Sequence, residues 1–556
     1  MKHLWPWLLA LVSGVCMAVT FPPFEFDGLA WFALAPLAAA VWFSPDTGRL
    51  RWLRLLGLGY TCGLAFFLIV FFWITEVTLP GWLLLGMYLA IYPALWALFA
   101  GTVGRPRETG GDLSVWTNSF NNLRLACRCA AAWVGLEWVR GTLFTGFGWN
   151  QLGVSQWQNV SIIQIADFAG VGGVTFLIVL MNLIVVMTVK RFSLEAGRGR
   201  LRPHYDFTIT LALVALAFLY GTSKFRESDD GQVPLRVAAV QANIPQYQKW
   251  DAEFEQHIVE TYRRLTDNAI ALQPDLLVWP EAATPFPLMQ HEGVQREVAG
   301  ILEQLKAGFL LGTLNRLAVG DFNAAVLLHA NGQYQVYHKM HLVPFGEYVP
   351  LRDVFPLFAW AVGDQVPSDF DAGEEPVVME TKPRPVPMTV DFPPFPKWSA
   401  LFPELKAERD PVRLAPLICF EDTVGEVVRQ FSGRGAQLLV TLTNDGWFRE
   451  SAGSRQHLSN AIFSAVMTKL PLVRAANTGV TCFIDARGRV LQQLQSEKGS
   501  TFIEGVLFGE ISVPASPRRT FYTTYGDLFS IACLIAALLS IRTCWLEPLR
   551  RHTTEN

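Results

Sequence analysis

The sequence is poor in charge. Only 17% of its 556 residues are Asp, Glu, Lys or Arg, whereas 51% are hydrophobic. Its 45 basic and 48 acidic residues leave a formal net charge of −3, so it lacks the basic excess of nucleic-acid-binding proteins. We therefore expect no nucleic-acid partner. A chain this apolar is unlike an ordinary soluble protein, and its length suggests two or more domains.

The cysteines form no recognisable metal or disulfide pattern. The eight of them lack the spacing of a metal site and the regularity of a disulfide framework. Only Cys419 and Cys482 fall in the charged part of the chain, and we interpret Cys482 as a core residue. His338 and His341 have no third ligand at a suitable spacing. We therefore expect neither a metal ion nor another cofactor.

Long apolar runs are abundant instead. Eight of them approach the length of about 20 residues that spans a bilayer. They cover residues 3–20, 28–43, 54–74, 82–103, 124–140, 165–189, 206–222 and 526–545. The first could be a signal peptide, but no small-x-small cleavage site follows it and a second apolar run comes at once. The sequence therefore predicts an eight-helix transmembrane bundle.

Basic residues gather in alternate loops between these runs. The loops after the second, fourth and sixth runs carry several Lys and Arg, whereas "FPPFEFDG" and "TEVTLPG" carry none. The positive-inside rule then places the N-terminus in the cytoplasm. We expect transmembrane helices 1–7 within residues 1–226, an extracytoplasmic domain at 227–519, and helix 8 with a cytoplasmic tail at 520–556.

The predicted outer domain has a different sequence pattern from the membrane part. From about Val233, short apolar runs alternate with amphipathic helices such as "DAEFEQHIVETYRRLTDNAIAL", which predicts an α/β domain. A proline-rich segment at about 383–411 interrupts the pattern, and no strand or helix should persist through it. This segment is either a surface insertion or a lid over a site.

Three reactive side chains each close an apolar strand. Glu281 ends "DLLVWPE", Lys339 ends "QYQVYHK", and Cys419 ends "RLAPLIC". Taken singly, a strand cysteine usually fills the core and a strand-end charge is usually solvated. Open α/β sheets, however, assemble their sites at the carboxyl edge. A carboxylate can take the proton of a thiol, and an ammonium can stabilise a thiolate and an oxyanion, so we predict a catalytic triad.

The segments around these residues resemble a known superfamily. "WPEAATPF", "YHKMHLVPFGEYVP" and "LICFEDTV" are similar to the nitrilase superfamily. The resemblance implies a nitrilase-like αββα sandwich over about residues 234–512. "FTGFGWNQLGVSQWQNVSIIQIADFAGVGGVTFLIVLMN", "QANIPQYQKWD" and "TFYTTYGDLF" narrow it to the membrane-embedded apolipoprotein N-acyltransferase family.

This resemblance implies an activity and its partners. Members of the family transfer the sn-1 acyl chain of a phospholipid, through a cysteine thioester, to the N-terminal amino group of diacylglyceryl-cysteine in apolipoproteins. The expected partners are therefore a phospholipid donor and a diacylglyceryl apolipoprotein acceptor, used in a ping-pong cycle. The expected location is the bacterial inner membrane, with the catalytic domain of a monomeric enzyme facing the periplasm.

The resemblance also assigns roles by position. Cys419 would be the nucleophile, Glu281 the general base and Lys339 the oxyanion stabiliser. Other residues matching family positions that support catalysis or bind substrate are Glu347, Glu421, Trp250 and Trp447. Phe420 stands where many members have Tyr, so a role for that hydroxyl is not expected here.

One charged pair lies in the predicted membrane part. Glu137 and Arg140 are three residues apart on one helical face, near the outer leaflet in the predicted topology. They either anchor the helix or contact a lipid headgroup.

Two other functions fit parts of the sequence. The triad alone would suit a membrane-tethered nitrilase-type amidohydrolase acting on a small C–N substrate, and a lipid-acyl thioester on Cys419 would argue against it. The membrane part alone would suit a transporter or scaffold with an inactive outer domain, for which Cys419 should be unreactive.

Overall fold

The computed structural model describes residues 4–45, 48–106, 114–197, 202–227, 231–249, 252–284, 286–350, 352, 369–387 and 406–554. The chain folds into two compact units. The helical unit comprises Met1–Glu227, Ser451–Met467 and Thr520–Asn556, and the sheet unit comprises Ser228–Glu450 and Thr468–Arg519.

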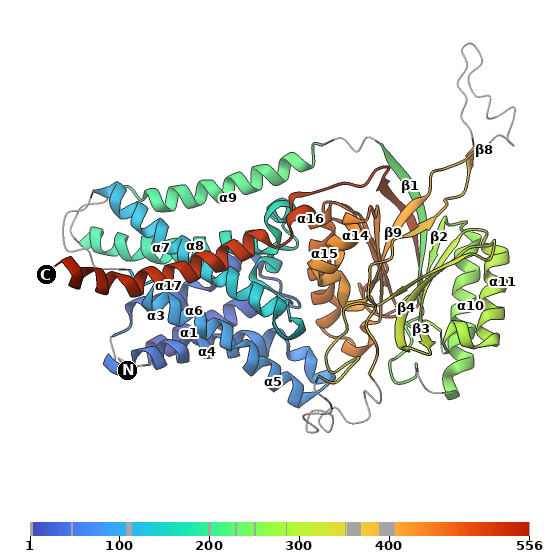
Figure 1. Cartoon of the computed structure of the whole chain (residues 1–556), viewed down its shortest axis with the longest axis horizontal. Helices are drawn as coiled ribbons and strands as arrows, with labels where there is room; N and C mark the ends of the chain where they lie inside the picture. Colours follow the sequence, from blue (N-terminus) through green and yellow to red (C-terminus); the bar gives the residue numbers. More distant parts are fainter. Residues whose placement is uncertain are drawn as a thin grey trace, which may run out of the picture. The chain divides into compact units, whose positions relative to one another are not determined.

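The helical unit contains a helix, or two consecutive helices, for each predicted apolar run (Figure 1). These are α1 (Trp5–Ala18), α2 (Ala30–Ala33), α3 (Ala35–Phe43), α4 (Arg51–Val70), α5 (Leu79–Leu89), α6 (Ile91–Thr102), α7 (Val115–Thr142), α8 (Ala166–Gly197), α9 (Tyr205–Lys224) and α17 (Leu528–Thr554). The short α16 (Phe521–Tyr525) and nearly all of α15 (Gly453–Thr468) belong to this unit as well.

Length and hydropathy support fewer membrane crossings than the sequence predicts. Within the described residues, four segments are long and apolar enough to span a bilayer, namely Gly48–Val70, Leu79–Thr102, Ile162–Gly197 and Tyr205–Lys224. The apolar helices Trp5–Ala18, Asp27–Phe43 and Leu528–Thr543 are shorter. Helix α7 is long, but its first turns carry polar residues such as Asn118, Asn121 and Arg124. An eight-helix bundle is therefore not established, whereas a helical unit with four candidate spans is.

Close backbone contacts hold the helices of this unit together. A Cβ on Gly59 of α4 would lie 2.3 Å from the carbonyl oxygen of Pro93 in α6. A Cβ on Gly135 of α7 would lie 2.8 Å from the Cα of Leu534 in α17. Small residues that let helix backbones approach in this way are typical of membrane helix interfaces.

A buried amide ties α15 to the rest of the helical unit. The side chain of Gln456 donates to the carbonyl oxygens of Pro22 and Val70, each at 2.8 Å. Its oxygen accepts from Trp73 Nε1 and Asn150 Nδ2, each at 2.9 Å. Because the amide is fully buried, losing one partner would leave an unsatisfied polar group inside the protein.

In its described part, the sheet unit contains two six-stranded mixed sheets (Figure 1). The first has the order β14-β1-β2-β3-β4-β5, with bounds β1 (Gln232–Gln241), β2 (Leu276–Val278), β3 (Gly308–Leu317), β4 (Gly320–Leu328), β5 (Tyr334–His338) and β14 (Gly505–Pro514). The second has the order β13-β12-β11-β10-β9-β6, with bounds β6 (Met379–Thr381), β9 (Val412–Ile418), β10 (Leu438–Thr443), β11 (Leu472–Ala476), β12 (Cys482–Ile484) and β13 (Val490–Gln493). In each sheet a parallel core is flanked by antiparallel strands.

Helices cover these sheets as the sequence pattern predicts. Figure 1 shows α10 (Glu255–Ala271) and α11 (Glu292–Leu305) beside the strands of the first sheet. They share its apolar core, in which the rings of Tyr262, Trp279 and Phe309 pack against one another. Helix α14 (Gly425–Gly433) contacts β9 in the second sheet. The prediction of an α/β domain is confirmed.

The proline-rich segment departs from expectation at its base. Strand β7 (Val386–Pro387) pairs with β8 (Lys406–Ala407), so a short strand ladder does form there. Both ends of the segment are held by the buried carboxylate of Asp275, which accepts from the backbone of Arg384 and from Arg409 Nη1, each at 3.0 Å. Residues 388–405 lie outside the described part, and with them most of the segment expected to be either a surface insertion or a lid.

Candidate active site

The three predicted catalytic residues follow strands of two different sheets. Lys339 comes directly after β5 and Glu281 three residues after β2, both in the first sheet. Cys419 comes directly after β9 in the second sheet. Each residue follows the end of its strand, as the sequence predicts, and the candidate site is built from both sheets of the unit.

Glu281 is held in a tightly packed turn. A Cβ on Gly312 of β3 would lie only 2.5 Å from the carbonyl oxygen of Pro280, so only glycine allows this approach. The carboxylate is 8% exposed, and its Oε1 accepts a hydrogen bond from Asn323 Nδ2 at 2.8 Å. Burial raises the pKa of Glu281, and the Lys339 ammonium offsets part of that rise. The carboxylate is thereby better matched to a thiol proton than an exposed Glu.

A second buried lysine supports the same turn. Lys249 Nζ donates to the carbonyl oxygen of Glu281 at 2.8 Å, and this lysine is only 5% exposed. Burial lowers the pKa of Lys249 to about 8, although Glu281 and Cys419 act to raise it. The sequence analysis did not single out this residue.

Lys339 is a buried ammonium between two carboxylates. It is 1% exposed, and its Nζ lies 2.8 Å from Glu347 Oε1 and 4.0 Å from Glu281 Oε1. Burial alone would lower the pKa of Lys339, but Glu347, and after it Cys419 and Glu281, raise it well above its usual value. Lys339 therefore remains protonated and acts as a fixed positive charge.

Cys419 sits at a sharp turn between β9 and the short helix η10 (Cys419–Thr423). Its φ of 54° lies in the left-handed region, which is strained for a residue with a side chain. The thiol is free and partly exposed. Burial, and then the Glu281 carboxylate, raise the pKa of Cys419, whereas Lys339 lowers it. The thiol therefore needs a base beside it to become a nucleophile.

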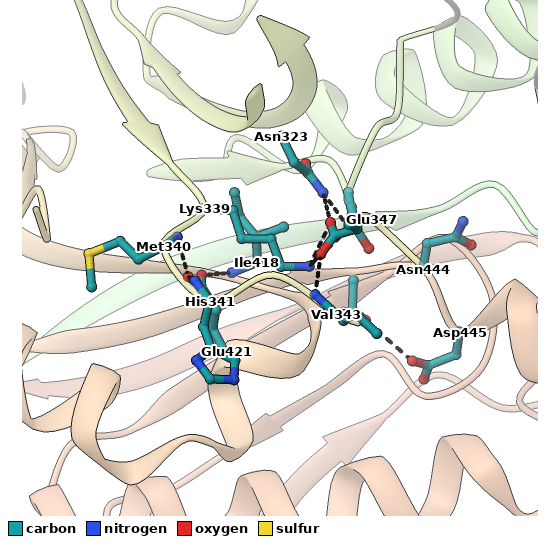
Figure 2. Close-up of polar contacts among 12 residues, drawn as sticks. Asn323, Lys339, Met340, His341, Val343, Glu347, Ile418, Glu421, Asn444 and Asp445 are labelled. Carbon is teal, nitrogen blue, oxygen red and sulfur yellow. Dashed lines mark hydrogen bonds and ion pairs between the residues drawn. The ribbon is translucent and has the colours of Figure 1, made fainter. Parts of the chain in front are cut away.

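Asn323 joins the two carboxylates of the site, and Figure 2 shows it beside one of them, Glu347. Its Nδ2 donates to Glu281 Oε1 at 2.8 Å and to Glu347 Oε1 at 3.0 Å. Glu347 Oε2 in turn accepts from the backbone of Val343 at 2.8 Å. Glu347 is thus fixed beside Lys339, and the sequence analysis, which named Glu347, missed the amide that orients it.

The turn between β4 and β5 decides which residue lies opposite Lys339. A two-residue turn at Asn331 and Gly332, the dipeptide typical of hairpins, would pair Lys339 with Ala324. The observed loop has three residues, Ala330, Asn331 and Gly332, so Ala324 pairs with His338, and the backbone of Lys339 donates to the carbonyl oxygen of Asn323 at 2.8 Å. The turn signal in the sequence therefore does not by itself locate Asn323.

The carboxylate of Glu421 accepts hydrogen bonds mainly from backbone N–H groups (Figure 2). Its Oε1 accepts from the hydroxyl of Tyr337 and from the backbone of Met340 and His341, at 2.7, 2.8 and 3.1 Å. Its Oε2 accepts from the backbone of Ile418 at 2.8 Å. This fully buried carboxylate therefore locks the segment after Lys339 to the strand that presents Cys419.

A second ionic cluster, which no sequence motif marks, joins Arg474 in the middle of β11 to Asp422 and Asp445, which follow β9 and β10. Arg474 Nη1 lies 2.6 Å from Asp422 Oδ2, and its Nη2 lies 3.0 Å from Asp445 Oδ2. Its Nε donates to the carbonyl oxygen of Val480 at 3.2 Å. All three charged side chains are completely buried, so they join three strands without contact with solvent.

The remaining predicted residues are mostly aromatic. Trp447 lies in η11 (Asp445–Phe448) and is 39% exposed, whereas Trp250 falls outside the described residues. The ring of Phe420 stacks on that of His341, with centroids 5.7 Å apart. Cys482 is free and fully buried on β12, which confirms its interpretation as a core residue.

Comparisons with known proteins agree with this architecture. The family model of the apolipoprotein N-acyltransferase N-terminal domain matches residues 13–184, and that of the carbon-nitrogen hydrolases matches residues 236–514. A protein of Geobacter metallireducens named apolipoprotein N-acyltransferase is 34% identical over 96% of this chain and 94% of its own length. The chain belongs to the apolipoprotein N-acyltransferase family.

More distant similarities follow the same pattern. A protein of Chlorobaculum tepidum with the same name is 29% identical over 96% of each chain. Among solved structures, an amidase from Nesterenkonia sp. matches 51% of this chain and 92% of its own, with 17% identity and a TM-score of 0.34. The family assignment rests on the full-length relatives and the family models, and not on this amidase.

Proposed function

We propose that the protein transfers the sn-1 acyl chain of a phospholipid to the N-terminal amino group of diacylglyceryl-cysteine in apolipoproteins. The observation that carries the chemistry is the buried grouping of Glu281 and Lys339, which both act electrostatically on the Cys419 thiol. Full-length similarity to proteins named apolipoprotein N-acyltransferase supports the choice of substrates.

In the first half-reaction, Cys419 Sγ attacks the carbonyl carbon of the sn-1 ester. Glu281 takes the thiol proton and passes it to the glycerol oxygen as the carbon–oxygen bond breaks, which releases lysophospholipid. The Lys339 ammonium stabilises the thiolate and the oxyanion of the tetrahedral intermediate. The acyl chain then remains on Cys419 as a thioester.

In the second half-reaction, the α-amino group of the acceptor attacks the thioester. With a reference pKa of about 7.7–8.0, this amine has a usable neutral fraction near neutral pH. The carbon–sulfur bond breaks, an amide forms, and the proton lost by the amine returns to the thiolate through Glu281. Water must be kept from the thioester during its lifetime. Phe420 and the partly exposed Trp447 favour this, and we expect Trp250 to contribute as well.

The remaining site residues have supporting roles in this proposal. Glu347 and Asn323 hold Lys339 and Glu281 in their relative positions through the shared hydrogen bonds. Glu421 keeps the Lys339 segment in register with the nucleophile strand. None of these steps uses a metal or another cofactor.

The membrane arrangement is part of the same proposal. The charge bias of the loops favours a cytoplasmic N-terminus, with membrane helices in residues 1–226 and 520–556 and a periplasmic catalytic domain at 227–519 in the bacterial inner membrane. We propose eight crossings, of which four meet the length and hydropathy of a full span, in a monomeric enzyme.

The test is an acyl-transfer assay with the full chain in detergent micelles. A phospholipid labelled in the sn-1 chain is incubated with a lipopeptide that carries an N-terminal diacylglyceryl-cysteine. We expect the label on the lipopeptide amine, no transfer from a phospholipid labelled only at sn-2, and no transfer to an N-acetylated lipopeptide. Hydrolysis of small amides without any acyl transfer would instead favour the membrane-tethered amidohydrolase.

A further inference from the structure

An arginine of the helical unit is buried with its guanidinium incompletely hydrogen-bonded. Arg140, in the last turn of α7, is 2% exposed. Among the residues that the structure describes, its guanidinium nitrogens Nη1 and Nη2 have no hydrogen-bond partner. A buried guanidinium without an acceptor is unfavourable, so buried charges are normally paired with an anion or another acceptor.

The carboxylate closest in sequence is already occupied. Glu137 Oε1 accepts from Trp133 Nε1 at 2.9 Å and from the backbone of Leu152 at 2.8 Å. Its Oε2 accepts from Thr175 Oγ1 at 3.0 Å. Glu137 thus anchors α7 to the segment around Leu152 and to α8. Glu137 therefore anchors the helix and also acts on Arg140 electrostatically, whereas Nη1 and Nη2 of Arg140 keep no hydrogen-bond acceptor among the described residues.

Aromatic groups surround the guanidinium without satisfying its terminal N–H groups. Its central carbon lies 5.4 Å from the centre of the Phe67 ring. Tyr88 and Tyr92 are further electrostatic neighbours, and their hydroxyls lie 2.7 Å from each other. Cation–π attraction and the negative end of the α7 dipole favour a positive charge here. Neither supplies a hydrogen-bond acceptor to Nη1 or Nη2.

We propose that Arg140 binds the phosphodiester of the phospholipid donor. The planar guanidinium offers two parallel N–H groups that match two phosphate oxygens. Arg140 lies two residues before the end of α7 at Thr142, which the proposed orientation places at the outer leaflet. This inference rests on the proposed function, because that function supplies the phosphate-bearing substrate.

The segment that follows α7 offers a route to this site. Phe144, Thr145 and Gly146 have consecutive φ values of 55°, 73° and 82°, and Phe144 is 80% exposed. The segment folds back so that the backbone of Phe147 donates to the carbonyl oxygen of Arg140 at 2.9 Å. Phe144 and Thr145 are strained at these φ values, whereas Gly146 is not, and displacement of this segment is the route by which a headgroup would reach Arg140.

The experiment compares two acyl donors with the same chains, phosphatidylethanolamine and diacylglycerol, in mixed micelles. We measure the rate at which each acylates Cys419 and take the ratio of the two rates. Arg140→Gln should lower this ratio about tenfold to a hundredfold, as expected for the loss of hydrogen bonds to a charged group. Arg140→Lys keeps the charge but not the paired N–H groups, so its ratio should lie in between.

Arg54→Gln is the matched control. Arg54 also has buried nitrogens without a partner among the described residues, but it lies in the first turn of α4, on the cytoplasmic side in the proposed orientation. Its ratio should equal that of the wild type. If Arg140→Gln does not fold, as judged by thermal unfolding, Arg140→Lys carries the test.

The outcomes separate this inference from the function beneath it. A wild type that forms no acyl-enzyme from any phospholipid contradicts the proposed function. If the wild type forms an acyl-enzyme but the ratio of the two donor rates is unchanged in both Arg140 variants, the inference is overturned. It is also overturned if the variants lose the same fraction of the acylation rate with both donors. Added inorganic phosphate should leave the wild-type ratio unchanged. If added phosphate lowers the wild-type ratio to that of Arg140→Gln, the site binds free phosphate and not a lipid.

Discussion

The sheet unit contains two buried ionic clusters, and they differ in how completely their charges are matched. In the scaffold cluster, Arg474 donates to Asp422, Asp445 and a carbonyl oxygen, and all three charged side chains are fully buried. In the catalytic cluster, Lys339 lies between the carboxylates of Glu281 and Glu347, and the Cys419 thiol stands beside them.

The comparison shows how to recognise a buried charge that takes part in a reaction. The Asp422 and Asp445 carboxylates raise the pKa of Arg474, so it keeps its proton under all ordinary conditions despite burial. In the catalytic cluster, burial raises the pKa values of both Glu281 and Cys419. The thiol therefore keeps its proton until Glu281, which is a stronger base than an exposed glutamate, accepts it. We therefore expect mutations in the catalytic cluster to affect rate and those in the scaffold cluster to affect stability.

The largest difference in acylation rate should be between variants of two cysteines, Cys419 and Cys482. Cys419→Ala should lower acyl-enzyme formation by at least about a thousandfold, because the nucleophile itself is lost. Cys482→Ala, fully buried on β12, should keep the wild-type rate per folded molecule and lose only stability. Quenched incubations with phospholipid, followed by mass spectrometry of the protein, measure both. A Cys482→Ala variant as inactive as Cys419→Ala would remove the contrast.

Glu281→Gln should slow acylation by about a hundredfold or more, since the general base is lost. The wild-type rate should fall as pH is lowered through the raised pKa of Glu281, hence at a pH above the ordinary glutamate value of about 4.3. Because the folded state holds this proton more tightly than the unfolded chain, stability falls as pH rises through the same range. Glu281→Gln should therefore not reduce stability at neutral pH, and a wild-type acylation rate in this variant would refute the base assignment.

Arg474→Met, in the scaffold cluster, should lower the stability of the protein and not the acylation rate per folded molecule. It leaves two buried carboxylates without their cation, which should cost about 3–5 kcal/mol of unfolding free energy. The matched control is Arg489→Met, because Arg489 pairs with Asp485 at the surface and should cost less than about 1 kcal/mol. Thermal unfolding measures both. A marginal effect of Arg474→Met on stability, with a large loss of rate per folded molecule, would mean that this cluster also belongs to the reaction.

Glu421→Gln should give a smaller, mixed effect. It places an amide where a carboxylate accepts from both Met340 and Ile418, so about 1–3 kcal/mol of stability should be lost. Acylation should slow less than in Glu281→Gln, because Glu421 acts only through the positions of Lys339 and Cys419. Glu426→Gln, in a surface pair with Arg429, is the control for the same change of side chain.

Much of the catalytic cluster could be predicted from the sequence. Glu281 and Cys419 each follow a buried apolar strand, and Lys339 follows the half-exposed strand β5; strand ends converge in α/β domains. The strand pattern did not show that two sheets contribute, because hydrophobic alternation identifies strands but not their partners; only the resemblance to an αββα sandwich implied two sheets. For the same reason Asn323 was missed, since a two-residue turn at Asn331 and Gly332 would have placed Ala324 opposite Lys339.

The scaffold cluster and the helical unit show a second limit of sequence reasoning. Asp422, Asp445 and Arg474 are scattered over more than one strand, so no spacing marks them as one group. The grouping of α15 with the helical unit depends on buried polar contacts such as those of Gln456 and Asn460, which lie in an ordinary amphipathic pattern. The apolar runs located the long helices of this unit but not α15 or α16, and among the described residues only four segments have the length and hydropathy of a full span.

The most direct test of the account is the intact mass of the full chain after incubation with phospholipid in the absence of an acceptor. We predict a mass increase of one acyl group on the wild type, located on the peptide that contains Cys419 and lost when an acceptor lipopeptide is added. Lysophospholipid should appear at the same time. If lysophospholipid forms only when acceptor is present, and no acyl group is ever found on Cys419, the covalent mechanism is contradicted.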